Sequence, residues 1–252
     1  MYNQRLCKNL GECLKSGNSA FKLKENGIDI DWIALKNPEI FTDICPARAI
    51  TVSGEEKSIE DIVIEIEKDL PFYRRSDGGV TLSGGEPLAQ GPELVQLLLE
   101  LKNREINVSI ETSLHVPWEN VERCISLTGT FLTDLKHTDP EKFKNYTNGE
   151  VSLVLNNLEK LSDLHDSIII RVPVVPDFNH TLVEMKGIID FTLSLKKITE
   201  IHFLPYHTLG NEKYKMLGMQ YRFNGTGKVD EQELAEYIKY AESAGLKAKI
   251  GG

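Results

Sequence analysis

From about residue 58 onward, short apolar runs typical of buried strands alternate with helical patterns, and this alternation constrains the fold more than any other feature. Five runs have strand character: Gly79–Ser83, Val108–Glu111, Phe131–Asp134, Ser167–Val175 and Ile201–Leu204. Repeated strand–helix units build a parallel sheet, either open or curved into a barrel. We therefore expect an α/β protein.

Capping signals and helical periodicity place helices between these runs. Ser58-Ile59-Glu60-Asp61 has the pattern of a capping box and opens an amphipathic helix that continues to Leu70. A second capped helix starts at Thr181, and a final helix follows Asp230 and ends near Gly245. Four further stretches have helical patterns: Leu94–Leu101, Trp118–Ile125, Pro140–Tyr146 and Val151–Leu164.

Residues 1–57 lack this alternation, and we treat them as a small separate module beside a main domain of residues 58–252. Cys7, Cys13 and Cys45 lie in this module, and the fourth cysteine is Cys124. Four cysteines in a chain of 252 residues do not make a disulfide framework. Cys124 lies on a predicted helix face, where we expect a small buried hydrophobic side chain.

Charge and hydropathy exclude two classes of partner. The formal net charge is −9, so the chain lacks the basic surface of a nucleic-acid-binding protein. No stretch is long and apolar enough to cross a bilayer, and the first residues contain no apolar signal segment. We therefore expect a cytoplasmic protein that binds neither nucleic acid nor membrane.

Polar side chains follow the strand runs, at the place where functional groups gather in parallel α/β folds. Glu86 follows the first run, Glu111 and Asp134 end the next two, Arg171 lies in the fourth and His207 follows the fifth. Together they suit a ligand with both an ammonium and a carboxylate, a bound cation, or acid–base chemistry. Any one of them could instead cap a strand or a helix.

Two glycines follow the first run, in the segment Gly84-Gly85-Glu86-Pro87. Glycines at this place let the backbone approach a ligand closely, and the proline fixes the turn. The segment is not G-x-G-x-x-G or G-x-S-x-G, and it lacks the Lys and Ser/Thr of a P-loop. On its own, the segment is weak evidence for a binding site, since a turn without any ligand would have the same residues.

The surrounding residues 72–88 strongly resemble the glycyl-radical-enzyme activating enzymes (pyruvate formate-lyase activating enzyme-like) of the radical S-adenosylmethionine superfamily. Further segments resemble that family's motifs in their order, with Asp177 where glycine is usual. These segments are Ile110–Ser113, Thr133–His137, Arg171–Asn179, Leu204–Tyr214 and Lys249–Gly252. The resemblance covers residues 58–252 nearly without gaps.

The resemblance implies a partial (β/α)6 TIM-like barrel and a reaction with two cofactors. In the family, a [4Fe-4S] cluster binds S-adenosylmethionine, and one-electron reduction cleaves it to methionine and a 5′-deoxyadenosyl radical. That radical takes a hydrogen from a glycine of a partner glycyl radical enzyme. An electron donor such as flavodoxin or ferredoxin is implied, while the protein orients the cofactor and excludes water.

By the same resemblance, ten residues bind S-adenosylmethionine, and no catalytic residue is assigned. The turn, Gly84, Gly85, Glu86 and Pro87, would hold the methionine ammonium. Glu111, Thr112 and Asp134 would lie near the carboxylate and a possible monovalent cation. Arg171 and His207 would contact the ribose or carboxylate side, and Lys136 completes the set of ten.

The cysteine triplet that holds the family's cluster, spaced C-x-x-x-C-x-x-C, does not occur in residues 1–252. We therefore expect a barrel that lacks its first strand, no bound metal, and a chain that is inactive by itself. Without that strand, the Gly79–Ser83 strand has an unpaired edge.

Residues 5–50 resemble the ferredoxin-like insert that many family members carry. Against the C-x2-C-x2-C-x3-C-P pattern of two-cluster ferredoxins, Cys7, Cys13 and Cys45 occupy three of eight ligand positions. The other five positions hold Leu10, Gly17, Leu35, Pro38 and Phe41. Because a cluster needs about four thiolates, we expect a degenerate insert without a cluster, in which leucine and phenylalanine fill the lost volume.

Three hypotheses remain open. The first is an activating enzyme of glycyl radical enzymes whose N-terminal segment, with the cysteine triplet, is absent here. The second is a cluster-less paralogue that only binds such an enzyme or a nucleoside-like ligand, and the substitutions inside the insert favour such divergence. The third is a TIM-like hydrolase or lyase with a metal between Glu86, Glu111 and Asp134; the absence of a histidine cluster and of a nucleophile–base pair in the sequence counts against it.

Overall fold

A computed structural model describes residues 1–36, 40–208, 210–220 and 229–251, and the chain divides into two compact units. The N-terminal unit consists of Met1–Glu56 and His207–Thr226. The sheet unit consists of Lys57–Tyr206 and Gly227–Gly252. The predicted domains, residues 1–57 and 58–252, stay a prediction, because a segment distant in sequence joins the N-terminal unit.

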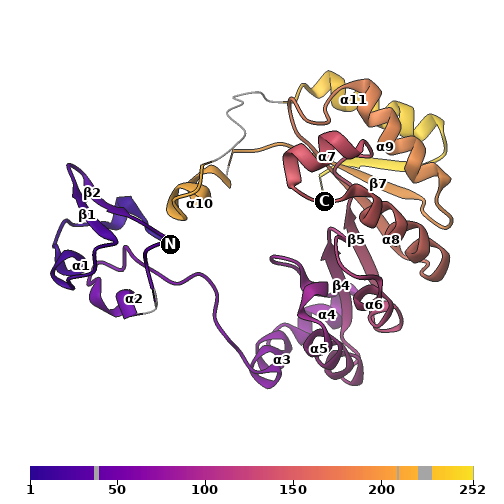
Figure 1. Ribbon diagram of the computed structural model, residues 1–252. Coiled ribbons are helices and arrows are strands. Elements are labelled where there is room, and N and C mark those ends of the chain that lie inside the picture. Colours follow the sequence, from indigo (N-terminus) through magenta and orange to yellow (C-terminus); the bar gives the residue numbers. More distant parts are fainter. Residues whose placement is uncertain (37–39, 209, 221–228, 252) are drawn as a thin grey trace. The chain divides into compact units, whose positions relative to one another are not determined.

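The sheet unit contains six parallel strands in chain order (Figure 1). They are β3 (Gly79–Leu82), β4 (Asn107–Thr112), β5 (Thr130–Asp134), β6 (Ile168–Val174), β7 (Glu200–Pro205) and β8 (Lys247–Ile250). The first five are the strands predicted from sequence, each with an end within a few residues of its predicted position. The strand β8 was not predicted, because Lys247-Ala248-Lys249-Ile250 is no apolar run; lysines on an edge strand are a common protection against pairing.

Two helices precede β3, and the other helices and 3₁₀ turns of this unit lie between its successive strands. They are α3 (Ile59–Glu67), α4 (Leu70–Ser76), the 3₁₀ turn η2 (Pro87–Gln90), α5 (Pro92–Asn103), α6 (Trp118–Glu122), the 3₁₀ turn η3 (Ile125–Leu127), α7 (Pro140–Thr147), α8 (Val151–Leu164), α9 (Leu182–Ser194) and α11 (Glu231–Ser243). The predicted caps are present: the Ser58 side chain accepts from the Asp61 amide, and Thr181 forms a full capping box with Glu184. Two predicted helices are shorter than expected, since α3 ends at Glu67 and α6 ends at Glu122.

The strand order and the helical connections give the sheet one apolar side. Every second residue of the central strands is buried, as in β6, where Ile168, Ile170, Val172 and Val174 alternate with partly exposed residues. Parallel strands in chain order with right-handed connections carry their helices on one face, and such a sheet curves toward a barrel. Figure 1 shows α5, α6, α8 and α9 beside the strands. The α/β class is confirmed, and the parallel sheet is compatible with a partial TIM-like barrel.

The N-terminal unit is a small assembly of short elements. They are η1 (Gln4–Leu6), α1 (Glu12–Lys15), the antiparallel hairpin β1 (Phe21–Lys24) and β2 (Gly27–Ile30), α2 (Ile40–Ile44) and α10 (Gly210–Met216). Its core contains seven buried apolar residues: Ala20, Phe21, Ile28, Ile30, Leu35, Phe41 and Ile50.

The helix α10 joins this unit through contacts with the chain's first residues and with Trp32. The Tyr2 amide donates to the Met216 carbonyl at 2.7 Å, and Arg5 pairs with Glu212 at 3.2 Å. Gly218, at φ +66°, lies so close to the Trp32 ring that a Cβ there would stand 2.0 Å from the indole nitrogen. Only glycine fits this approach.

Within the described residues, the helices are all too short or too polar to cross a lipid bilayer.

Candidate functional site

Strand register places the charged residues of three strands on one side of the sheet. Asp134 of β5 is paired with Arg171 of β6, and Glu111 of β4 is paired with Leu132 of β5. Residues paired across parallel strands project to the same face, so Glu111, Asp134 and Arg171 lie opposite the helix-covered side. The sequence prediction that these groups converge at the carboxyl ends of the strands is confirmed in the geometry.

Arg171 links the two carboxylates. Its Nη2 donates to Glu111 Oε1 at 2.5 Å, and its Nε lies 3.4 Å from Asp134 Oδ1. The Ser83 hydroxyl donates to the other oxygen of Glu111 at 3.0 Å. These two donors, Arg171 above all, lower the pKa of Glu111 despite its partial burial, so this carboxylate is ionised at neutral pH.

Asp134 is held less completely. Lys136 Nζ lies 3.4 Å from its Oδ2, while Oδ1 is buried without a hydrogen bond in the described structure. Burial raises the pKa of Asp134, and the neighbouring cations Lys136 and Arg171 oppose that shift. Arg171 Nε is likewise buried without a hydrogen bond. These two groups face each other as an ion pair at 3.4 Å but make no hydrogen bond. Buried polar groups without hydrogen bonds are costly, which makes this a place where a polar ligand gains contacts.

Glu86 fixes the glycine turn to the end of β4. One carboxylate oxygen accepts from the Thr112 hydroxyl at 2.7 Å and from the Leu88 amide at 3.2 Å. The other accepts from the Ser113 amide at 2.9 Å and from its hydroxyl at 2.7 Å. With four donors on its two oxygens, the Glu86 side chain holds the loop in position, and the next residue, Pro87, is buried.

Gly84 and Gly85 leave open space in front of this loop. Gly84 has φ +126°, and a Cβ at either glycine would meet no atom within 4 Å. The turn is therefore open on the side that a ligand would approach, and its backbone groups are accessible there.

Sequence reasoning did not single out Ser83, Ser113 or Asn179 as residues that hold the site. Asn179 is fully buried, and its amide donates to the carbonyls of Lys136 and Pro173 at 2.7 and 2.8 Å. It thereby ties the β6–α9 loop to the end of β5. The only signal for it was its place in the Arg171–Asn179 motif.

His207 belongs to the N-terminal unit, whereas the other nine predicted cofactor-binding residues belong to the sheet unit. The structure brings those nine together around the carboxyl ends of β3 to β6. For His207 it describes an exposed side chain directly after Tyr206, and its predicted role at the site stays a prediction.

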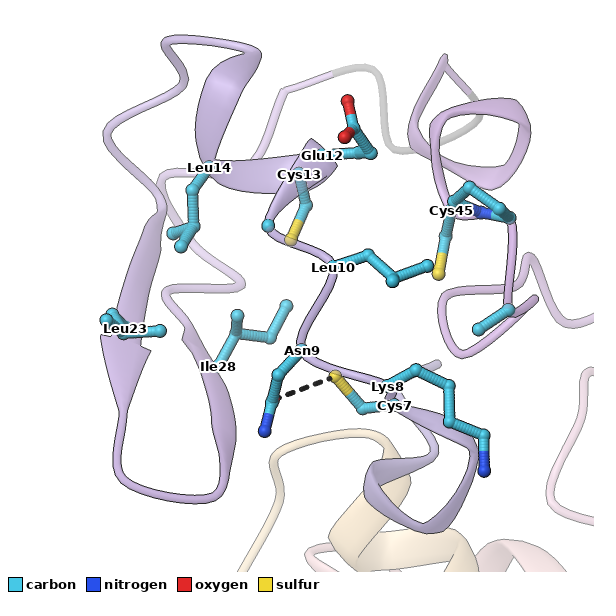
Figure 2. A pocket seen from close by; sticks show the side chains of 13 residues that line it. Cys7, Lys8, Asn9, Leu10, Glu12, Cys13, Leu14, Leu23, Ile28 and Cys45 are labelled. Atoms are coloured by element: carbon cyan, nitrogen blue, oxygen red, sulfur yellow. Dashed lines mark hydrogen bonds between the residues drawn. The ribbon is translucent and has the colours of Figure 1, made fainter.

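The cysteines divide into two groups. Cys124 is 1% exposed, and burial raises its pKa to about 11, so it is the buried hydrophobic residue that the sequence predicted. Cys7, Cys13 and Cys45 line one cavity of the N-terminal unit (Figure 2). In the part of the chain that the structure describes, no three histidine, cysteine or acidic side chains are arranged to hold a metal ion.

The residues at the lost ferredoxin ligand positions behave in two ways. Leu35 and Phe41 are 8% and 5% exposed and belong to the N-terminal core; that they fill the volume of a lost cluster stays a prediction. Leu10 is 54% exposed, so the expectation that it fills a lost cluster volume is wrong. Leu10 is exposed because it lies on the short, irregular segment between η1 and α1, which lines a surface cavity and no core. Pro38 lies outside the described residues.

Sequence comparison finds activating enzymes among the relatives of this chain. The family model for the radical SAM superfamily matches residues 43–189. The chain is 36% identical over 212 residues to the (2S)-3-sulfopropanediol dehydratase activating enzyme of Klebsiella oxytoca, covering 82% of this chain and 67% of that protein. It is 33% identical over 256 residues to the trans-4-hydroxy-L-proline dehydratase activating enzyme of Clostridioides difficile, covering 100% of this chain and 84% of that protein.

A solved structure agrees with these relatives. A domain of the pyruvate-formate lyase-activating enzyme from Bacteroides vulgatus superimposes with a TM-score of 0.57 at 28% sequence identity. The match covers 69% of this chain and 99% of that domain.

Proposed function

Because the chain belongs to the radical SAM superfamily and, within it, to the glycyl-radical-enzyme activating enzymes, we propose that its sheet unit binds S-adenosylmethionine for the activation of a glycyl radical enzyme. One observation carries the assignment of the site. Asp134 Oδ1 and Arg171 Nε are buried beside each other without hydrogen bonds, next to an open glycine turn. Such a site suits a ligand whose ammonium and carboxylate lie close together.

The described residues fit the methionine part of that ligand. The backbone of Gly84 and Gly85 would take the ammonium, because Glu86 is already saturated by Thr112, Ser113 and Leu88 and serves to hold the turn. Arg171 would take the carboxylate.

Around that methionine, Glu111 and Thr112 keep Arg171 and Glu86 in position. Asp134 and Lys136 supply a further acceptor and donor, and His207 is proposed for the ribose. When bound, S-adenosylmethionine supplies by reductive cleavage the group that removes hydrogen from a glycine of the protein substrate.

The residues of this chain do not fit the family's [4Fe-4S] cluster that binds S-adenosylmethionine. Residues 1–252 contain no C-x-x-x-C-x-x-C, and the four cysteines do not reproduce its spacing. We therefore derive no step through that cluster, and we propose that the chain by itself does not hold it. The comparisons give no support to a cluster-less binding protein or to a TIM-like hydrolase.

The finer parts of the proposal concern fold and partners. We propose a partial (β/α)6 barrel without its first strand, a ferredoxin-like module in residues 1–57, and a cytoplasmic location. The protein substrate is a glycyl radical enzyme, as for the related activating enzymes, and the electron donor is a flavodoxin or ferredoxin. The open edge of β3, which pairs only with β4 among the described strands, is compatible with the barrel.

Binding of S-adenosylmethionine to this chain tests the site without any need for catalysis. We predict that Arg171→Ala and Asp134→Asn each weaken binding about 10- to 100-fold, the cost of a lost charge-assisted hydrogen bond. Isothermal titration calorimetry measures the affinity.

Lys196→Ala is the matched control, because Lys196 is 74% exposed and pairs with Asp163 on the same unit. This variant should bind as the parent chain does. Unchanged binding in both site variants would contradict the proposed site.

A further inference from the structure

Two loops at the carboxyl ends of the strands lie next to each other in the sheet unit. The β5–α7 loop, residues 135–139, contains Lys136, and the β6–α9 loop, residues 175–181, contains Asn179. The Asn179 amide joins the two loops by donating to the Lys136 carbonyl at 2.7 Å. A second connection between them is centred on His137, whose side chain is buried.

The hydrogen bond at Nδ1 decides which nitrogen of the His137 ring carries the proton. Nδ1 accepts from the Asp139 amide at 2.9 Å, so the proton of the neutral ring is on Nε2. Asp139 is the N-cap of α7, and its side chain accepts from the Lys142 amide. The His137 ring therefore holds the end of the β5–α7 loop in the turn that begins α7.

The other nitrogen of the ring faces α9. His137 Nε2 lies 3.7 Å from Glu184 Oε1, too far for a hydrogen bond, and is buried without a hydrogen bond in the described structure. Glu184 closes the capping box of α9 with Thr181, and it also pairs with Lys142 of α7. The imidazole thus lies between the first turns of α7 and α9, with one nitrogen toward each.

Phe178 completes this cluster from the β6–α9 loop. Its ring centroid lies 5.3 Å from that of His137 and 4.5 Å from that of Tyr146, on which it stacks. The Tyr146 hydroxyl donates to the Asp177 carbonyl at 2.6 Å. Phe178 directly precedes Asn179, so the packing of the phenyl ring on His137 and Tyr146 helps to place the Asn179 amide.

Burial keeps the ring neutral. Burial is the main cause of the lowered pKa of His137, and Glu184 opposes it. The charged groups that face the ring are Glu184 of α9 and, from α7 and its cap, Lys142 and Asp139, while the β6–α9 loop presents the apolar Phe178. A proton on Nδ1 would remove the acceptor of the Asp139 amide. Because the folded pKa lies below the ordinary value of about 6.5, this stabilisation is complete above about pH 6.5 and declines as the pH falls below it.

We propose that His137 is a positioning residue for S-adenosylmethionine, whose imidazole joins the first turns of α7 and α9 and thereby fixes the loops that carry Lys136 and Asn179. This inference rests on the proposed function, in which Lys136 is a donor at the binding site. His137 touches no ligand itself, since its side chain is buried, and it acts through the two loops.

His165 offers a matched control at the other end of the sheet. Its Nδ1 accepts from the Ser167 amide at 3.1 Å, which is the same contact with the residue two positions later. Its Nε2 donates to the Thr128 carbonyl at 2.9 Å. His165 lies between α8 and β6, so it belongs to the amino ends of the strands, away from the proposed site.

Three variants test the proposal by calorimetry with S-adenosylmethionine and by hydrogen exchange. His137→Phe keeps an aromatic ring without nitrogens and should weaken binding about 10-fold, the equivalent of one lost hydrogen bond. It should also speed amide exchange in residues 135–139 and 175–181. His137→Asn keeps an acceptor for the Asp139 amide and should bind within about threefold of the parent. His165→Phe should change neither binding nor the exchange of the two loops.

The pH profile separates positioning from a merely structural role. Between pH 7 and pH 5.5 the affinity of the parent should fall about threefold more than that of His137→Asn, which has no ring to protonate. His207 is present in both chains, so the difference belongs to His137. This comparison does not need His137→Phe and decides the question even where that variant does not fold.

Three results would overturn the proposal. They are parent-like binding and loop exchange in His137→Phe, a loss in His137→Asn as large as in His137→Phe, and identical pH profiles of the parent and His137→Asn. A parent chain that does not bind S-adenosylmethionine would contradict the proposed function instead. The exchange of the two loops would then still decide whether His137 holds them.

Discussion

The two units of this chain differ in how their sequences specify their structures. In the sheet unit, strand–helix repeats bury one continuous core, and each element carries its own periodic signal. In the N-terminal unit, seven buried residues form the core, the elements are short, and α10 comes from residues more than 150 positions away. Local patterns therefore describe the first kind of unit well and the second kind poorly.

The largest expected effect tests whether the two cores are independent. Phe41 is buried in the N-terminal core against Phe21, and Phe131 is fully buried in β5. We predict that Phe41→Ala costs the N-terminal unit about 3–5 kcal/mol of unfolding free energy and leaves the sheet unit unchanged. Phe131→Ala should do the reverse.

The chain's two tryptophans report on the units separately, since Trp32 lies in one and Trp118 in the other. Urea unfolding followed by fluorescence in Trp118→Phe and Trp32→Phe backgrounds gives one transition for each unit. If Phe41→Ala shifted both transitions equally, the two units would unfold as one cooperative structure, and the prediction of independent cores would be wrong.

The second prediction concerns the edge of the sheet unit, where Glu200 ties β7 to β8. Its carboxylate lies 2.6 Å from His202 Nε2 and accepts from Lys247 Nζ at 2.9 Å. The hydrogen bonds with His202 and Lys247 lower the pKa of Glu200 to about 2. A depressed pKa means that this stabilisation is complete above about pH 4.3 and is lost as the pH falls toward 2.

Glu200→Gln should therefore remove up to about 3 kcal/mol of stability at neutral pH. It should also flatten the decline of stability between about pH 4.3 and pH 2. Urea unfolding at several pH values, read through Trp118, measures both. Glu150→Gln is the control, because its exposed carboxylate lies 3.6 Å from Lys144 and should contribute less than about 0.5 kcal/mol. A pH profile of Glu200→Gln that matches the parent would refute the role of this network.

Sequence patterns predicted the bounds and caps of those elements that have a local signal of their own. The bounds of α8, the capping box at Thr181 and the ends of β3 to β7 all follow from local periodicity and capping. The sequence also predicted that Glu111, Asp134 and Arg171 lie close together, because the carboxyl ends of parallel strands lie at the same edge of a sheet. The donors to Glu86 and the Asn179 contacts could not be derived, since they depend on side-chain directions in loops.

In the N-terminal unit, the informative relations are between segments. Neither the contact of Tyr2 with Met216 nor the close approach of Gly218 to Trp32 has a local signal. The cysteines are visible in the sequence, yet the sequence does not show that Cys7, Cys13 and Cys45 line one cavity, because this depends on how two segments pack together.

The smallest expected effect compares one loop residue in each unit. Asp177, between β6 and α9, has φ +64°, where the family pattern has glycine, and Asn9 in the N-terminal unit has φ +53°. The left-handed conformation costs most side chains about 1–2 kcal/mol and costs aspartate and asparagine less. The contacts of Asp177 here are made by its backbone, with His180 Nδ1 and the Tyr146 hydroxyl.

Asp177→Gly should therefore stabilise the sheet unit by up to about 1 kcal/mol, and Asp177→Ala should destabilise it by about as much. Asn9→Gly should change the N-terminal unit less, because it relieves a similar strain but removes the acceptor of the Cys7 thiol, 3.6 Å away. Trp118 and Trp32 fluorescence report the two units in urea. If Asp177→Gly were destabilising, the Asp177 side chain would have to contribute a contact of its own. Aspartate in place of the family's glycine at position 177 would then stabilise the loop through that contact, and its backbone strain would not be the dominant effect.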